Sequence, residues 1–190
     1  MTKGNIVIIS GPSGSGKTTL YKRLLSSQRF KGRLVKSMSV TTRSPRPGER
    51  NGRDYLFMSK NKFISERRQG HFLESQKVFD NYYGTPKSNV RALLNKGRHV
   101  LLCIDVKGAR VVSRLHPQAI KIFIAAPSMR ALEKRLKNRA SESKRDLNLR
   151  LKTARQEMAE SKRYDYIVVN KDLGKAYRQL GSILALRLGI

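Results

Sequence analysis

A glycine-rich turn near the amino terminus restricts the possible folds of this chain more than any other segment does. Residues 11–18 read GPSGSGKT and satisfy the pattern G-x-x-x-x-G-K-[ST]. They follow a short β-branched apolar run, residues 5–10, and precede leucines at helical spacing in residues 17–28. Glycines let successive backbone N–H groups converge on phosphate oxygens, and the helix N-terminus adds partial positive charge. The order strand, glycine turn, helix therefore predicts a phosphate-binding loop in an α/β protein.

Two side chains of this loop and one distant acid are predicted to bind the phosphates and Mg²⁺. Lys17 is expected to reach the β- and γ-phosphates, and the Thr18 hydroxyl to bind Mg²⁺. Asp105 ends a second buried-strand candidate, residues 99–105, in the manner of the acid that holds Mg²⁺ or its waters in P-loop proteins. A helix-capping or surface aspartate is the alternative. The residues predicted to bind the triphosphate are Gly11, Pro12, Ser13, Gly14, Ser15, Gly16, Lys17, Thr18 and Thr19.

Apolar runs alternate with helical patterns along the rest of the chain. Further strands are predicted at residues 120–125 and 166–170, and helices at residues 88–95, 128–139, about 146–162 and 173–188. Strands that alternate with helices predict a parallel sheet with helices on both faces. Residues 41–55, dense in Arg, Pro and Gly, are expected to be a structured loop, and residues 55–85 a small insertion of strands and turns with a helix-like stretch around residues 63–69.

Charge and cysteine content bear on the partners and the compartment. The chain has 41 Lys and Arg against 13 Asp and Glu in 190 residues, a formal net charge of +28. Such an excess attracts polyanions, phosphates or anionic membranes, although a basic solvated surface is the favoured explanation of the charge by itself. No apolar stretch approaches the roughly 18 residues that span a bilayer, and we expect neither a membrane anchor nor a cleaved signal. The single cysteine, Cys103, fits a reducing compartment, so we expect a cytoplasmic protein.

Several segments further along the chain resemble guanylate kinase. They are residues 39–49 (SVTTRSPRPGE), 51–55 (NGRDY), 72–74 (FLE), 81–85 (NYYGT), 104–109 (IDVKGA) and 164–170 (YDYIVVN). The similarity runs in order over about residues 4–180. It implies one domain over residues 1–190: a P-loop parallel-sheet core (1–36 and about 88–190), a small mixed α/β GMP-binding insertion (about 37–87) and a helical lid (about 136–150).

The resemblance also implies an activity and its site. The activity is ATP-dependent, reversible phosphorylation of GMP, and of dGMP, to GDP with Mg²⁺. Residues implied for the GMP phosphate are Arg43, Arg46, Tyr55 and Tyr83, those for the guanine are Ser39, Glu74 and Thr85, and Asp105 also belongs to the GMP side. The chemistry is sensible in itself, because a phosphate dianion suits guanidinium groups and phenol hydroxyls. A carboxylate such as Glu74 can accept both guanine donors, N1–H and N2–H, although a strand-edge glutamate paired with a base is the alternative.

The resemblance implies that the migrating phosphoryl group is surrounded by Lys17 and three lid arginines, Arg135, Arg139 and Arg150. A solvated basic helix is the alternative for these arginines. The chain departs from the resembled pattern at Cys103, where an acid is usual, and at Asp80, Lys107 and Lys171. We expect these departures to lower activity rather than abolish it, and Cys103 to be a small apolar core residue.

Two other functions deserve comparison with this one. A small kinase for a phosphorylated sugar is disfavoured by Glu74 and the NYYGT segment, because a sugar offers no guanine edge to read. The other is a nucleotide-responsive module in which the same fold binds RNA or DNA through its positive charge. Lys17 and Thr18 of the phosphate loop favour catalysis, with nucleic acid as a secondary partner at most.

Overall fold

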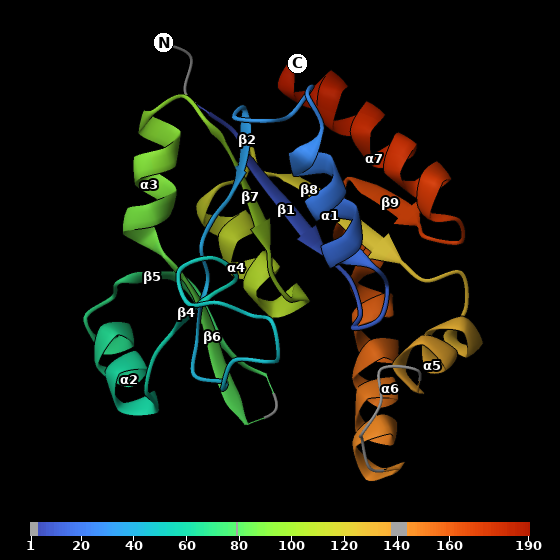
Figure 1. Cartoon of the computed structure of the whole chain (residues 1–190), viewed down its shortest axis with the longest axis horizontal. Coiled ribbons are helices and arrows are strands. Elements are labelled where there is room, and N and C mark those ends of the chain that lie inside the picture. Colours follow the sequence, from blue (N-terminus) through green and yellow to red (C-terminus); the bar gives the residue numbers. More distant parts are fainter. Residues whose placement is uncertain (1–3, 79, 138–143) are drawn as a thin grey trace.

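The main sheet of the protein is parallel and has the phosphate-loop strand at its centre. The computed structural model describes residues 4–78, 80–137 and 144–190 (Figure 1). Five strands lie in the order β2-β7-β1-β8-β9 and pair in parallel throughout. They are β1 (Ile6–Ser10), β2 (Leu34–Lys36), β7 (His99–Cys103), β8 (Ile120–Ala125) and β9 (Tyr166–Val169). The predicted parallel sheet is confirmed.

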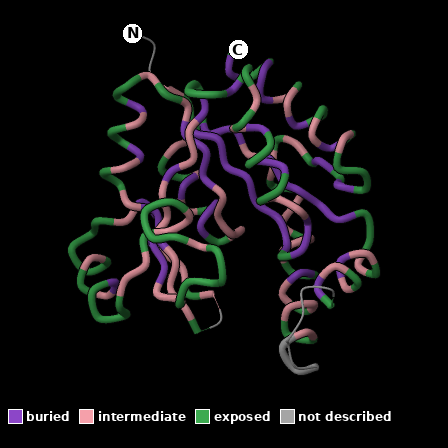
Figure 2. Tube along the Cα trace, in the orientation of Figure 1, coloured by how far each residue is buried: buried purple, intermediate pink, exposed green. Residues whose placement is uncertain are grey.

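Helices cover both faces of this sheet, which explains why its strands read as continuous apolar runs. Successive side chains of a strand point to opposite faces. Val7 and Ile9 of β1 therefore pack in a cluster with α1 (Lys17–Ser26) and α7 (Leu173–Leu188). Ile6 and Ile8 pack on the other side with α3 (Lys87–Asn95) and α4 (Val106–Leu115). Figure 2 shows the central strands as the most continuously buried part of the chain.

A second, smaller sheet is built from the insertion. Its order is β4-β3-β6-β5, from β3 (Val40–Thr41), β4 (Leu56–Phe57), β5 (Phe72–Val78) and β6 (Asn81–Pro86), and it mixes one parallel pair with two antiparallel pairs. The helix α2 (Lys60–Arg68) buries Phe63, which stacks on Phe72 and Tyr82 with ring centroids 4.6 and 5.3 Å apart. Tyr82, which is half-buried, therefore packs against the helix of the insertion.

A pair of helices forms the third part. α5 (Met129–Lys137) and α6 (Lys144–Ala159) pack through Leu132, Leu136 and Ala154, and a short 3₁₀ turn, Glu160–Arg163, leads into β9. Figure 1 shows this pair and the small sheet extending from the same end of the main sheet, on opposite sides. The strands β1, β7 and β8 finish at that end of the main sheet. The small sheet and the helix pair, which we call the two appendages, therefore flank the phosphate loop.

Most predicted elements match the structure to within a few residues, and one helix was missed. The strand over residues 120–125 and the helix over residues 173–188 have the predicted bounds. α4 was not predicted, although Asp105 begins it as an N-cap and Ala109 and Val112 repeat at helical spacing. No helix within the described ranges is long and apolar enough to cross a membrane.

Candidate functional site

A cavity of about 270 Å³ lies at the carboxyl ends of the central strands. Parallel α/β sheets bind ligands at this edge. The phosphate loop, the small sheet, the end of β7 and α6 all contribute to its wall. The lining residues are Gly11, Ser13, Lys17, Thr18, Ser39, Tyr55, Glu74, Gln76, Val78, Tyr83, Gly84, Cys103, Ile104, Asp105, Arg150, Thr153 and Glu157. The structure thus brings together predicted residues from all three parts of the chain.

The phosphate loop is held in shape by a contact that the sequence did not reveal. Asn170 follows β9, is 5% exposed, and its Nδ2 donates to the Ser15 carbonyl over 2.8 Å. Gly16 has φ +92°, and a Cβ there would lie 2.2 Å from that same Nδ2. Only glycine therefore fits at this position. The position of Asn170 at the end of the predicted apolar strand, YIVVN, was the one available signal.

Arg135 of α5 is attached to the same loop. Its Nη2 donates to the Asn170 carbonyl over 2.8 Å and its Nη1 to the Gly14 carbonyl over 3.5 Å. The predicted catalytic residue Arg135 thus lies against the phosphate loop and does not line the cavity. Arg139, its predicted companion, lies outside the described residues.

Lys17, Thr18 and Asp105 face the cavity together. Lys17 Nζ donates to the carbonyl oxygens of Gly11 over 2.5 Å and Pro12 over 2.9 Å. Asp105 Oδ1 accepts from the Gly108 N–H over 2.7 Å, so this acid caps α4 and lines the cavity at once. Burial raises the pKa of Asp105, and the Gly108 hydrogen bond and the Lys107 and Lys17 ammonium groups oppose that rise.

The acid predicted to read guanine is buried at the opposite end. Glu74 of β5 is 6% exposed, and its Oε1 accepts from Thr85 Oγ1 of β6 over 2.7 Å. Burial raises the pKa of Glu74 to about 7; the Thr85 hydrogen bond lowers it and the Asp105 charge raises it further. A Cβ at Gly108 would lie 2.6 Å from Glu74 Oε2, so α4 approaches the acid closely only because residue 108 is glycine.

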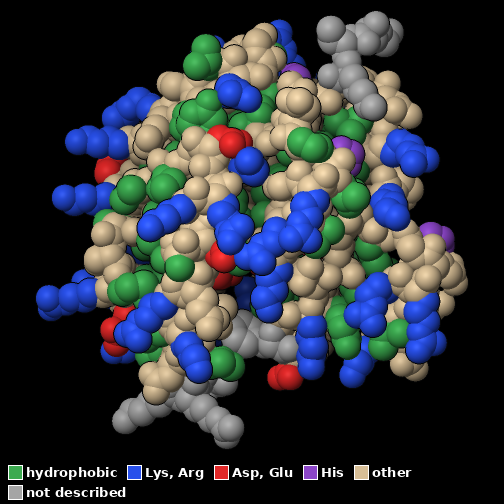
Figure 3. All heavy atoms as spheres, turned by 180° about the vertical axis from the view of Figure 1, so that it is seen from behind, with side chains coloured by type: hydrophobic (Ala, Val, Ile, Leu, Met, Phe, Trp, Pro, Cys, Tyr) green, Lys and Arg blue, Asp and Glu red, His purple; other side chains and the backbone are tan. Residues whose placement is uncertain are grey.

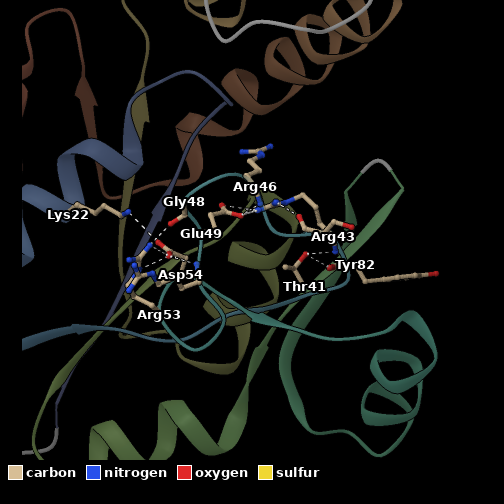
Figure 4. Close-up of polar contacts among 11 residues, drawn as sticks. Lys22, Thr41, Arg43, Arg46, Gly48, Glu49, Arg53, Asp54 and Tyr82 are labelled. Atoms are coloured by element: carbon tan, nitrogen blue, oxygen red, sulfur yellow. Dashed lines mark hydrogen bonds and ion pairs between the residues drawn. The ribbon is translucent and has the colours of Figure 1, made fainter.

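The two predicted phosphate-binding tyrosines lie side by side, with Tyr55 and Tyr83 ring centroids 6.2 Å apart. Burial raises the pKa of Tyr55 to about 12, so its hydroxyl remains a hydrogen-bond donor. Arg43 Cζ lies 5.6 Å from the centre of the Tyr55 ring. Its Nη2 donates to both Glu49 oxygens over 3.0 and 2.9 Å (Figure 4). Arg43 is therefore beside the cavity and fixed by an ion pair that the sequence did not single out.

The loop that carries these residues is fastened by a second acid. Asp54 Oδ2 accepts from the Arg50 N–H over 3.1 Å and from Arg53 Nε over 2.8 Å, and Oδ1 lies 3.5 Å from Lys22 Nζ of α1 (Figure 4). These contacts lower the pKa of Asp54 to about 2. Arg46 is exposed, outside the cavity lining, and its N–H donates to Glu49 Oε2 over 2.8 Å. Of the two predicted phosphate-binding arginines, only Arg43 contacts a cavity residue.

One face of α6 closes the cavity. Arg150, predicted from the sequence, lines it together with Thr153 and Glu157, which were not. Cys103, expected in the core, also lines the cavity, and burial raises the pKa of its thiol, so it stays protonated. Among the described residues no cluster of three His, Cys, Asp or Glu forms a metal cage. Thr18 and Asp105 both line the cavity and fit Mg²⁺, because that ion usually takes one or two protein oxygens beside phosphates and water.

A parallel sheet with a phosphate loop at its central strand, and a cavity that this loop shares with a small inserted sheet and a helix, is the arrangement of the P-loop nucleoside monophosphate kinases. The sequence profile of guanylate kinase matches residues 3–186. A guanylate kinase of Rickettsia bellii is 43% identical over 96% of this chain and 94% of that protein. One of Desulfotalea psychrophila is 45% identical over 97% of this chain and 90% of that protein. The chain belongs to the guanylate kinase family.

The fold agrees with this assignment. The crystal structure of guanylate kinase from Anaplasma phagocytophilum superposes with a TM-score of 0.79 at 32% sequence identity, covering 99% of this chain and 88% of that one. The α/β core with its small mixed sheet is therefore the architecture of the family.

Proposed function

We propose that this guanylate kinase transfers the γ-phosphoryl group of ATP to GMP, giving ADP and GDP, across the cavity described above. One observation carries the assignment of the site: a buried carboxylate, Glu74, and the phosphate-loop residues Lys17 and Thr18 line a single cavity. An acceptor phosphate oxygen attacks the γ-phosphorus in line, and the bond between that phosphorus and the bridging oxygen to the β-phosphate breaks. The protein has no covalent chemistry to perform, so its work is positioning and charge neutralisation.

At the donor end, the backbone of residues 11–19 binds the triphosphate of ATP and Lys17 neutralises the β- and γ-phosphates. Thr18 and Asp105 would hold Mg²⁺, which supplies further charge neutralisation when it is bound. Asn170 and Arg135 keep the loop in its binding shape through the contacts with Ser15 and Gly14.

At the acceptor end, Glu74 accepts the guanine N1–H and N2–H donors, and Ser39 and Thr85 complete the recognition of the base. Thr85 already donates to Glu74, which leaves Glu74 Oε2 toward α4 and the cavity. The phosphate of GMP binds to the hydroxyls of Tyr55 and Tyr83 and to the guanidinium of Arg43. We assign Arg46 to the same phosphate, which requires the exposed loop around it to move toward the cavity.

Closure of the two appendages completes the site. The insertion, about residues 37–87, carries the acceptor pocket, and the lid, about residues 136–150, carries Arg139 and Arg150 toward the migrating group. Water that reached a half-open site would compete with GMP for the phosphoryl group, so closure excludes it. We expect Arg150, which lines the cavity from α6, to contact the transferring phosphates.

The direct test is an ADP-release assay with GMP, dGMP, AMP, CMP and UMP offered side by side. GMP is expected to be used best and dGMP next, because both present the guanine edge to Glu74. Equal use of AMP, or of the pyrimidine nucleotides, would contradict the proposed acceptor pocket.

Secondary binding of nucleic acid stays a prediction from the net charge of +28. Figure 3 shows Lys and Arg side chains spread over the rear face, with few acids among them. The cytoplasmic location stays a prediction from the single cysteine.

A further inference from the structure

The helix α6 turns three polar side chains toward the cavity, and the function proposed above uses only the first of them. Arg150, Thr153 and Glu157 are spaced by three and four residues, so they share one face of the helix. Arg150 has a task in phosphoryl transfer, and a hydroxyl such as that of Thr153 is ordinary beside a polar ligand. Glu157 is unexpected, because a carboxylate beside two phosphorylated substrates repels both.

Glu157 also differs from two neighbouring acids, Glu133 and Glu160, in having no hydrogen-bond or ion-pair partner among the described residues. Glu133 of α5 lies 2.7 Å from Lys137, and Glu160 lies 2.8 Å from Arg110. Glu157 forms no hydrogen bond or ion pair with any residue in the described ranges. Bases outnumber acids 41 to 13 in this chain, so a partner on the protein would have been easy to supply.

The residues around Glu157 place its carboxylate near the proposed position of phosphoryl transfer. Burial raises its pKa to about 7, the Lys17 ammonium lowers it and the Asp105 carboxylate raises it. Lys17 belongs to the phosphate loop and Asp105 to the proposed Mg²⁺ position. A half-buried carboxylate that has no partner among the described residues is unfavourable in the substrate-free protein, so its presence calls for a hydrogen-bond donor that arrives with the substrates.

Few donors are available at that position. The phosphates are anionic acceptors, and the guanine N–H groups are taken by Glu74 in the proposed function, on which this inference rests. The remaining donors are O–H groups: the ribose hydroxyls of the acceptor nucleotide and the waters that Mg²⁺ keeps when it binds. We propose that Glu157 is a substrate-binding residue that accepts a hydrogen bond from one of these O–H groups, adjacent to the transferring phosphates.

For the variant Glu157→Gln, the proposal predicts weaker substrate binding without a loss of folding stability. The amide keeps the shape of the side chain and removes the charge, so the substrate-free protein should unfold at the same temperature as wild type or higher. A carboxylate that served the fold would give the opposite result. Glu133→Gln, which breaks an exposed ion pair on the neighbouring helix, is the matched control.

The experiment measures binding without turnover, by titration calorimetry on the full chain. One arm titrates GMP in the absence of metal and ATP, and the other titrates Mg²⁺ into protein loaded with a non-hydrolysable ATP analogue. Loss of a hydrogen bond to a charged acceptor weakens binding by about tenfold or more. A loss of that size in the GMP arm identifies a ribose hydroxyl as the donor, and one in the Mg²⁺ arm identifies metal-bound water.

Two results would overturn the proposal. One is that both arms stay within about twofold of wild type, a difference too small for a hydrogen bond to a charge. The other is a fall in the unfolding temperature of Glu157→Gln below that of the Glu133→Gln control. The proposed function fails separately, if wild-type protein shows no GMP-dependent release of ADP.

Discussion

Replacing Glu74 by glutamine tests the base-reading pocket most directly. The side chain is 6% exposed and its Oε1 already accepts from Thr85 Oγ1 over 2.7 Å. In Glu74→Gln the amide oxygen can keep the Thr85 hydrogen bond, which turns the NH₂ group toward the guanine N1–H and N2–H. Donors then face donors, and the charge that both guanine groups bound is gone.

The magnitude follows from the two lost hydrogen bonds. A hydrogen bond to a charged group contributes about 1.5–3 kcal/mol. Ionising a carboxyl whose pKa is about 7 costs little free energy at neutral pH. Most of the hydrogen-bond energy therefore contributes to the binding of GMP. A loss of about 3–4 kcal/mol corresponds to a fall in kcat/KM for GMP on the order of 10²–10³.

The stability of the variant should move in the other direction. The pKa of Glu74 is raised in the folded state, so its contribution to stability is present below about pH 4.5 and is lost as the pH rises through about 7. Above that range the ionised acid destabilises the substrate-free fold by up to about 3 kcal/mol, which glutamine relieves. At about pH 8 the unfolding temperature of Glu74→Gln is therefore expected to equal or exceed that of wild type.

The assay is coupled ADP release with GMP varied at saturating ATP, and then with ATP varied at saturating GMP. A selective loss for GMP, with KM for ATP unchanged, is the expected result. The reasoning is refuted if kcat/KM for GMP falls by less than about fivefold. It is refuted as well if ATP binding weakens in proportion, because Glu74 would then support the fold instead of reading the base.

Four further predictions concern the phosphate loop, the pH dependence and the net charge. Lys17→Ala should lower turnover by at least about 10²-fold with an unchanged circular dichroism spectrum, and near-normal activity would contradict the donor site. Asn170→Ala should raise KM for ATP and lower the unfolding free energy by about 1–3 kcal/mol, because the Ser15 carbonyl loses its buried donor; an equal rise in KM for GMP would argue against a role confined to the loop. GMP affinity of wild type should fall as the pH drops through about 7 and Glu74 takes up a proton, and the same curve for Glu74→Gln should lack this step. RNA binding, if the net charge drives it, should weaken steeply with salt, and no association at low ionic strength removes that partner.

Local features of the sequence were enough to predict the phosphate loop and the central strands around it. The pattern G-x-x-x-x-G-K-[ST] specifies its own loop, because each glycine and the lysine act within a few residues of one another. The strands β1, β7 and β8 were predicted from continuous apolar runs, which only a sheet covered on both faces produces. Asp105 was placed by the same reasoning, since it follows such a strand. The helix α4 was missed although a helix-capping role had been the alternative for Asp105, because the metal-binding interpretation of that acid was preferred.

The predictions for the GMP-binding insertion depended on the resemblance to a known family, and only the structure revealed the contacts within it. Glu49 lies six residues from Arg43, but nothing in the pattern told whether that arginine would bind the acid or face the cavity. The same holds for Arg46, which the structure places in an exposed loop. The sequence around an arginine does not tell whether its side chain points to solvent or binds a ligand.

The sequence by itself determined the phosphate loop, the alternating order of strands and helices, and the family of this chain. Tertiary structure decided which distant side chains meet there. Asn170 reaches Ser15 across 155 residues of sequence, and Glu157 reaches the cavity because α6 packs on α5 with that face inward. Periodicity gives the buried face of a helix, but the polar residues that adjoin a distant loop depend on how whole elements pack, and no local spacing records that arrangement.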